Sequence, residues 1–224
     1  MSEIDWSPVW ISLKIAAITM VFTFVLGLMA AWFVYNRKRE ITKAVCDGIF
    51  TMPLVLPPTV AGFFLLLLFG VNGVFGSTLW QVFGIRVAFT QIGAVLASVV
   101  ISFPIMYRSA RAALEQVDDD LVLAGRTLGM SETRIFLKVL IPNALPGLVG
   151  GGVLSFARGL GEFGATAMIA GNIPGKTRTL SLAVYAETAA GDMDQAGVYV
   201  GIILLLCFVA VIGMNCFTMV KKKG

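Results

Sequence analysis

The chain has 224 residues, of which 58% are hydrophobic and 13% charged, and its mean hydropathy is +0.88. A single soluble core of this length does not need so many apolar residues, so we predict an integral membrane protein. The net charge is +4 without a single histidine, which excludes imidazole metal sites, histidine general bases and the Ser-His and Cys-His pairs of hydrolases.

Five apolar stretches are long enough to cross a bilayer, which takes about 20 residues of helix. They are residues 9–35, 49–69, 88–107, 140–160 and 198–220. The first is too long for a signal-peptide core and lacks a small-residue cleavage site, so we expect it to remain in the mature protein. Lys14 near its outer end can snorkel to the interface. The expected fold is all-α, with five transmembrane helices in one transmembrane domain over residues 1–224.

The basic residues predict the orientation of these helices, because lysine and arginine are enriched in cytoplasmic loops. They gather in three clusters: Arg37, Lys38, Arg39 and Lys43; Arg108, Arg111, Arg126, Arg134 and Lys138; Lys221, Lys222 and Lys223. With five spans, all three clusters fall on one side. The other side receives Glu3, Asp5, the segment 70–87 with Arg86 as its only charge, and the mixed-charge segment 161–197. We therefore expect the N-terminus outside and the C-terminus in the cytoplasm of a bacterial inner membrane, and we do not interpret the bases as a nucleic-acid footprint.

Prolines lie near the starts of two of the predicted spans. Pro53, Pro57 and Pro58 begin the second span, and Pro142 and Pro146 begin the fourth. Each proline removes a backbone hydrogen bond or distorts a helix, and broken helices line cavities in transporters. The alternative is a pair of ordinary helix starts, where proline is welcome. Pro57 and Pro58 are therefore candidate pathway residues.

The segment 118–142 predicts a short helix, a tight turn and a second helix that rises to the membrane. Asp118, Asp119 and Asp120 offer an N-cap and favourable charge for a helix over 121–128, and Gly129 follows as a C-terminal stop that favours a left-handed backbone. Ser131 then caps the next helix. Such an exposed knob between two spans suits docking into a groove on a partner.

Two opposite charges lie one helical turn apart at the end of the fourth span. Arg158 and Glu162 are expected to pair, because each charge is expensive alone in or near lipid. The pair is either a gate beside the pathway or a structural ion pair, and direct anion coordination is disfavoured because Glu162 would repel a dianion. Gly161 and Gly164 allow close helix approach or leave space for a path. The apolar segment 161–170 either re-enters the membrane or lies at its outer interface.

The loop after Gly171 carries Lys176 and Arg178. These bases either attract an anion or contact a partner protein, or they simply face solvent. The chain contains no G-x-x-x-x-G-K-[ST] phosphate loop, so active transport requires a separate nucleotide-binding subunit. We expect no cofactor or metal in this chain; Cys46, Cys207 and Cys216 are too scattered for a zinc cluster or a disulfide framework.

The segment 118–142 resembles the cytoplasmic coupling loop of ABC-importer permeases, whose pattern is E-A-A, three residues, G, nine residues and I-x-L-P. Leu123, Ala124 and Gly125 stand in the first triplet, Gly129 is the glycine, and Val139, Leu140, Ile141 and Pro142 close the motif. Leucine in place of the glutamate removes any polar contact that the family's glutamate makes. A plain interhelical loop with a glycine turn is the alternative.

Three further stretches are similar to the molybdate and sulfate permease subunits: residues 51–62, 155–166 and 171–177. The short length, without an N-terminal extension, is more typical of the molybdate branch. The resemblance implies a homodimer on two ATPase subunits, which bind ATP and Mg²⁺, and an external oxyanion-binding protein. It also implies alternating access, in which the coupling loop transmits the movement of the ATPases.

The same architecture also serves sulfate, thiosulfate or tungstate, because tetrahedral dianions differ little in charge. An intramembrane enzyme would need a nucleophile and a base, or paired carboxylates, within the spans. We interpret Glu162 as the only acid close to a span centre or end, which disfavours that class. A membrane scaffold would not need the glycine-turn loop.

Overall fold

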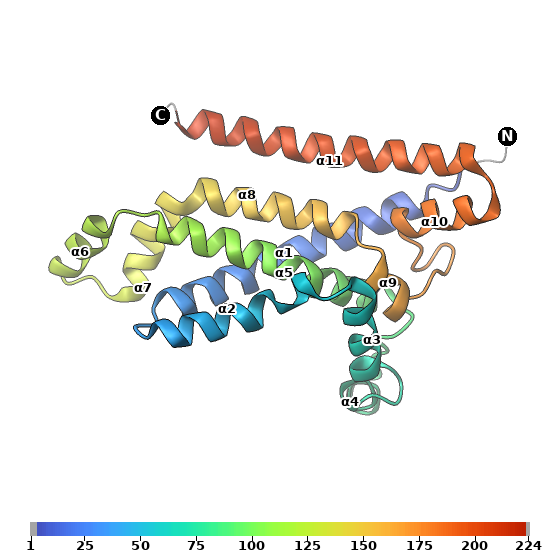
Figure 1. Ribbon diagram of the computed structural model, residues 1–224, viewed down its shortest axis with the longest axis horizontal. Helices are drawn as coiled ribbons and strands as arrows, with labels where there is room; N and C mark the ends of the chain where they lie inside the picture. The colour runs from blue at the N-terminus through green and yellow to red at the C-terminus, as the bar shows by residue number, and fades with distance from the viewer. Residues whose placement is uncertain (1–3, 223–224) are drawn as a thin grey trace.

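The computed structural model describes residues 4–222, with side chains over 4–216, and its regular elements are all helical (Figure 1). The helices are α1 (Ser7–Tyr35), α2 (Glu40–Val55), α3 (Pro58–Phe69), α4 (Val74–Phe83), α5 (Gln91–Glu115), α6 (Asp119–Thr127), α7 (Glu132–Ile135), α8 (Ile141–Leu160), α9 (Gly164–Ile169), α10 (Leu180–Ala190) and α11 (Met193–Lys222). Glu3 and Lys223, which entered the charge comparison, lie outside the described residues.

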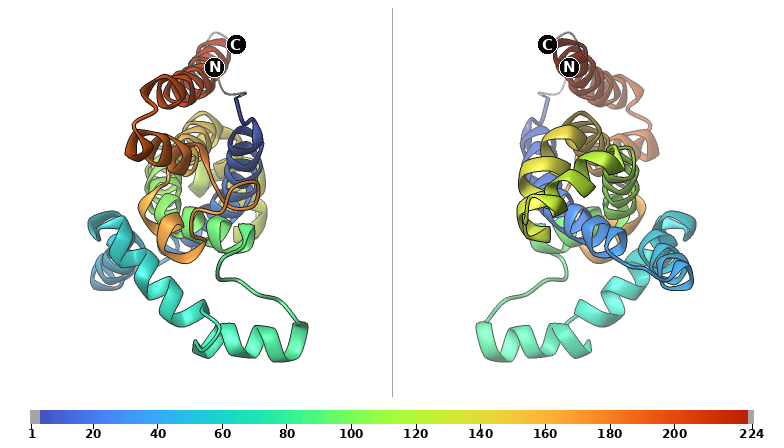
Figure 2. Two further views of the ribbon diagram at one scale, coloured as in Figure 1. Left: turned by 90° about the vertical axis from the view of Figure 1, so that its right-hand side faces the viewer. Right: turned by 90° about the vertical axis from the view of Figure 1, so that its left-hand side faces the viewer.

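Four long apolar helices confirm four of the predicted spans. They cover Ser7–Tyr35, Gln91–Glu115, Glu132–Leu160 and Met193–Cys216. Helices α1, α5 and α8 pack on one another at the centre, α2 packs on α5, and α11 lies along α8 and α10 (Figures 1 and 2). The start of α1 and the end of α11 lie at opposite ends of the bundle, as five crossings require.

The second span, predicted as one stretch over 49–69, is two helices bent by 105°. The break falls at Leu56 and Pro57, whose ψ angles are 139° and 133°. Each of them precedes a proline, and a following proline ring pushes a residue out of the α-helical region. Pro58 then opens α3 in the first turn, where its missing N–H leaves no extra unsatisfied group. Consecutive prolines therefore end one helix and begin another.

Beyond the break, the chain forms an arm that leaves the bundle. Helices α3 and α4 lead away from the long helices before the chain returns to α5 (Figure 2). The predicted loop 70–87 contains α4, which ends at Gly84 with a φ of 65°. Glycine reaches this left-handed conformation without the steric cost that other residues meet.

The fourth span begins earlier than predicted. Helix α7 runs into a π-helical turn at Phe136–Leu140 and then into α8, so one continuous helix covers 132–160. Pro142 has no N–H for the carbonyl of Lys138, and its ring crowds that carbonyl, so the wider π turn directly before it accommodates the proline. The Asn143 side chain donates to the carbonyl of Val139 at 2.7 Å.

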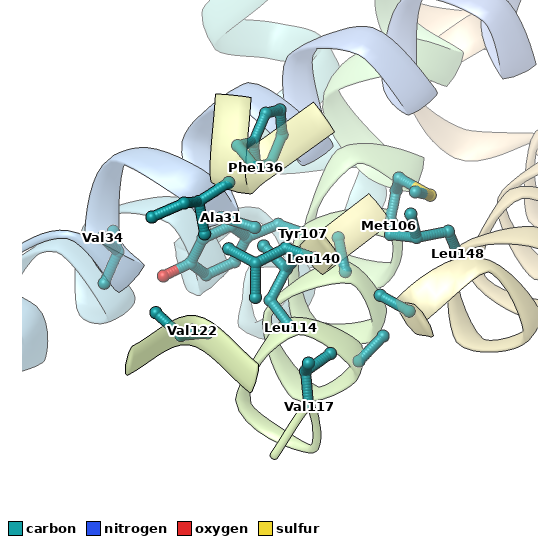
Figure 3. Packing of buried hydrophobic residues seen from close by; sticks show 14 residues of the cluster. Ala31, Val34, Met106, Tyr107, Leu114, Val117, Val122, Phe136, Leu140 and Leu148 are labelled. Atoms are coloured by element: carbon teal, nitrogen blue, oxygen red, sulfur yellow. The ribbon is translucent and has the colours of Figure 1, made fainter. Parts of the chain in front are cut away.

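A buried apolar cluster joins the segment 118–140 to the long helices. Val122 from α6 and Ile135 from α7 pack with Ala31 and Val34 of α1 and with Leu114 of α5. Figure 3 shows most of this cluster around the end of the bundle. The short helices α6 and α7 are therefore seated on the bundle and are not a free loop.

Candidate functional site

The short helix predicted over 121–128 is α6, which begins two residues earlier, at Asp119, and ends at Thr127. The Asp118 carboxylate accepts from the backbone N–H of Asp120 at 2.9 Å. At the other end Gly129 has a φ of 73°, which confirms the predicted left-handed backbone. The N–H of Gly129 donates to Arg126 and that of Met130 to the carbonyl of Gly125, at 3.0 and 3.1 Å. This pair of bonds is the Schellman motif, which satisfies carbonyls at a helix end.

The exposed surface of α6 and of the residue after it carries large apolar side chains among charged ones. Leu123 is 53% exposed and Leu128 80%, although both are large aliphatic side chains. Gly125 is buried on the opposite face, where a Cβ atom would lie 3.2 Å from Cγ1 of Ile135. A small residue at this position lets α6 pack closely on α7. Exposed leucines on a rigid, capped helix form a surface that suits docking into a groove.

The turn between α6 and α7 is closed by polar contacts that include one ion pair the sequence analysis missed. The Ser131 hydroxyl accepts from the N–H of Arg134 at 3.4 Å, which confirms the predicted N-cap. Arg126 donates to both carboxylate oxygens of Glu132, at 2.8 and 3.2 Å. The hydrogen bond to this carboxylate raises the pKa of Arg126 above its ordinary value. Both side chains are exposed, so the pair contributes little to stability.

The structure divides the predicted coupling residues into two groups. Leu123, Ala124 and Gly129 lie on the exposed surface of the knob. Val139 and Ile141 are half-buried against the apolar cluster at the base of α8, and Pro142 stands in the first turn of that helix. Val139 and Ile141 therefore pack at the base of the knob and do not form its exposed surface.

The two halves of the candidate pathway meet where α3 crosses α9. A Cβ atom on Gly164 would lie 3.1 Å from Cβ of Pro58 and 3.2 Å from the backbone nitrogen of Thr59. On the facing helix, a Cβ on Gly62 would lie 2.7 Å from the Cα of Ala165. Glycine at both positions lets the two backbones approach. Gly164 and Pro58 were separate predictions from the sequence, and Gly62 was not predicted as a site residue.

Arg158 and Glu162 form the predicted ion pair, with Arg158 Nη1 2.8 Å from Glu162 Oε2. Helix α8 ends at Leu160, so Glu162 lies in the turn before α9. Its other oxygen, Oε1, accepts from the N–H of Ala165 at 2.9 Å. Glu162 is only 2% exposed and thus joins the end of α8 to the start of α9 from inside the fold. Among the described residues, a Cβ at Gly161 would meet only the carbonyl oxygen of Ala157, at 3.7 Å, so no close helix approach within them requires that glycine.

A protein-family model described as the inner membrane component of binding-protein-dependent transport systems matches residues 23–218. This match includes the α6–α7 knob and the α3–α9 crossing. The chain belongs to this permease family. It is a multi-pass inner membrane protein of an ABC importer, in which the ATPase is a separate subunit.

Curated relatives cover nearly the whole permease. It is 43% identical over 198 residues to the molybdenum transport system permease ModB of Escherichia coli K12, covering 88% of this chain and 86% of the relative. It is 40% identical to the putative molybdenum permease YvgM of Bacillus subtilis, covering 97% and 93%. The sulfate permease CysT of Salmonella typhimurium is 33% identical, with 96% and 82% covered. The permease therefore resembles the molybdenum relatives more than the sulfate one.

The fold of the permease matches a solved ABC importer. The inward-facing MetNI methionine transporter has a chain that aligns with a TM-score of 0.75, covering 95% of this permease and 94% of that chain. The sequence identity is 20%, so this likeness concerns the fold alone.

A charged network that the sequence analysis missed ties α2 of the permease to α5. Asp47 accepts a hydrogen bond from the Tyr107 hydroxyl and pairs with Arg111, which also donates to Glu115 at 2.8 Å. Phe50 adds an edge-to-face contact with Tyr107, with ring centroids 5.1 Å apart. The spacing of Arg111 and Glu115 was one sequence signal, and Asp47, two residues before the predicted second span, was the other. Glu162 is therefore not the only acid close to a span, contrary to the sequence interpretation.

The two bases of the loop after Gly171 differ in their contacts. Arg178 donates to Asn172 at 3.0 Å and to Glu187 at 3.3 Å, so its charge is used within the fold. Lys176 is exposed, and the described residues give its side chain no ion pair. Of the two bases, Lys176 is therefore the one available to an anion.

Proposed function

We propose that this permease carries molybdate into the cytoplasm, from a periplasmic oxyanion-binding protein. The observation that carries the proposal is the 40–43% identity to molybdenum permeases over most of the chain, against 33% for the sulfate permease. ATP as the energy source fits a dianion, because each negative charge that enters against an inside-negative potential costs about 2.3 kcal/mol per 100 mV. Tungstate, sulfate and thiosulfate are the competing substrates.

The end of the bundle that carries α6 is the proposed cytoplasmic end. The basic turn between α1 and α2 lies at this same end, which supports the orientation predicted by the positive-inside rule (Figure 1). Two copies of the permease stand on an ATPase dimer that holds ATP and Mg²⁺. The exposed Leu123 and Leu128 of each copy enter a groove on one ATPase, and its closure moves the spans.

The junction of α3, α8 and α9 is the proposed outer gate. Pro57 and Pro58 break the second span there, and Glu162 holds α8 and α9 together through Arg158 and the backbone of Ala165. A buried carboxylate that pairs with an arginine and accepts a backbone hydrogen bond locks one arrangement of these helices. Loss of the ion pair releases that arrangement. The pair controls access and does not coordinate the anion.

Uptake by reconstituted vesicles tests the substrate. The permease, its ATPase and the binding protein are placed in vesicles, and uptake of radioactive molybdate is followed with ATP on the ATPase side. Molybdate uptake that needs both ATP and the binding protein, and that a hundredfold excess of sulfate does not suppress, is the expected result. Faster sulfate uptake under the same conditions would assign the chain to the sulfate branch.

Cysteine labelling tests the orientation. Cysteines replace Arg39, in the α1–α2 turn, and separately Lys176, in the loop after α9, in a variant without native cysteines. A membrane-impermeant maleimide should label Lys176→Cys in intact spheroplasts and Arg39→Cys only in inverted vesicles. Labelling of both residues from one face would refute the five-span arrangement.

A further inference from the structure

An apolar groove of about 340 Å³ opens on the bundle surface between α1 and α5. Its walls are Ile18 and Phe22 from α1 and Ile92 and Val95 from α5. Phe22 is 53% and Ile92 52% exposed, so the described chain leaves about half of each residue uncovered.

Polar groups gather at one end of this groove. The Lys14 ammonium donates to Oε1 of Gln91 at 3.1 Å, and the Gln91 amide donates to the carbonyl of Lys176 at 2.9 Å. An ammonium has three N–H donors, so Lys14 keeps two after this bond. The described residues give neither Lys14 nor Lys176 an ion pair.

The polar end lies at the level of a membrane interface. Gln91 is the first residue of α5, so the groove begins where that span begins. Trp10, one turn before Lys14 on α1, is 72% exposed, and tryptophan is enriched at membrane interfaces. Farther along α1 the exposed side chains are apolar, including Val25 and Met29. The groove thus runs from an interface into the hydrocarbon region.

We propose that this groove binds an anionic phospholipid of the outer leaflet, a site that rests on the membrane placement in the proposed function. The acyl chain lies along Ile18, Phe22 and Val95. The phosphate accepts hydrogen bonds from Lys14, and Lys176 adds positive charge beside it. An anionic headgroup is preferred over a zwitterionic one because none of the described residues that line the mouth carries a carboxylate to attract a choline or ethanolamine cation.

Native mass spectrometry of the permease–ATPase complex, with phosphatidylglycerol and phosphatidylcholine as probes, tests the site. Lys14→Gln should weaken the tightest phosphatidylglycerol binding about fivefold, which corresponds to about 1 kcal/mol. Lys14→Arg should keep it. Arg86→Gln is the matched control, because Arg86 stacks on Trp80 in the α4 region, 4.3 Å from the ring centroid. Equal losses for Lys14→Gln and Arg86→Gln, or unchanged binding in Lys14→Gln, would overturn the proposal.

Two further measurements separate the lipid from other occupants. Ile92→Trp fills the groove and leaves Lys14 in place, so it should also weaken phosphatidylglycerol binding, whereas inorganic phosphate should not compete with the lipid. Displacement by inorganic phosphate would instead indicate a simple anion site. A disulfide between two permease copies through Ile18→Cys, in a cysteine-free variant, would show that a second copy covers the groove and would also overturn the proposal. Binding is read without substrate, so its failure is distinct from a failure of molybdate transport.

Discussion

Gly62 of α3 lies against Ala165 of α9 so closely that a Cβ atom on Gly62 would come within 2.7 Å of the Ala165 Cα. The same Cβ would lie 2.9 Å from the Ala165 carbonyl oxygen. Backbone atoms cannot rotate away as the end of a flexible side chain can. The crossing therefore depends on the absence of a side chain at Gly62. It fixes α3, which follows the proline break, against α9.

Gly62→Ala should destabilise the permease, because overpacking costs about 1–3 kcal/mol and outweighs the gain in helix propensity, about 1 kcal/mol. Gly201→Ala in α11 is the matched control, since nothing in the described chain lies within 4 Å of a Cβ there. Thermal unfolding of the purified complex in one detergent checks the difference. A Gly62→Ala variant as stable as Gly201→Ala would mean that the crossing relaxes without cost.

Gly129→Val should separate the permease from its ATPase while membrane insertion stays intact. A β-branched residue resists the left-handed backbone at Gly129, at a cost of about 1–2 kcal/mol, so the end of α6 tilts. Co-purification of the ATPase and transport-linked ATP hydrolysis are the measurements, with the amount of inserted permease as the reference.

Two variants control the Gly129 experiment. Gly129→Asn should retain coupling, because asparagine tolerates the left-handed region. Gly191→Val carries the same kind of strain at a φ of 84°, at the end of α10 and the opposite end of the bundle, and should keep the ATPase bound. Normal coupling in Gly129→Val would make this residue an ordinary loop glycine.

Arg158→Met should abolish most uptake, and Glu162→Gln in the same protein should restore part of it. The single change leaves the 2%-exposed Glu162 charged without its partner, and breaking a buried pair in this way costs about 3–5 kcal/mol. Glutamine removes the charge and keeps an oxygen for the N–H of Ala165. The change therefore tests the ion pair separately from the hydrogen bond to Ala165. Strictly additive effects on the logarithm of the uptake rate would argue against coupling.

Asp47→Asn should loosen α2 from α5. The change removes the charge that pairs with Arg111, although the Tyr107 hydroxyl keeps an acceptor. Hydrogen exchange at the backbone amides of α2 should rise, because local stability governs exchange. Glu40→Gln removes an exposed pair with Lys43 on the same helix and should leave exchange unchanged. Equal exchange in the two variants would show that the Asp47 network does not hold α2.

Features that depend on a few neighbouring residues were predictable from the sequence. The lengths of the apolar stretches predicted the spans, because about 20 helical residues cross a bilayer whatever they pack against. The aspartates at 118–120, Gly129 and Ser131 predicted the limits of α6 to within two residues and the start of α7, because caps and left-handed turns are set by residues within one helical turn. The prolines at 57 and 58 indicated a distortion of the second span.

The tertiary structure alone decided the 105° bend at those prolines, the crossing of Gly62 with Ala165 and the network between Asp47 and Tyr107. These contacts join segments that are far apart in the chain. In a soluble helix, an apolar stripe reveals which face is buried. Here α1 and α11 are apolar on all sides, because lipid accepts the same side chains as the protein interior, so the sequence pattern does not indicate which faces meet. Close packing of small residues and pairing of distant charges decide that, and both exist only once the helices are assembled.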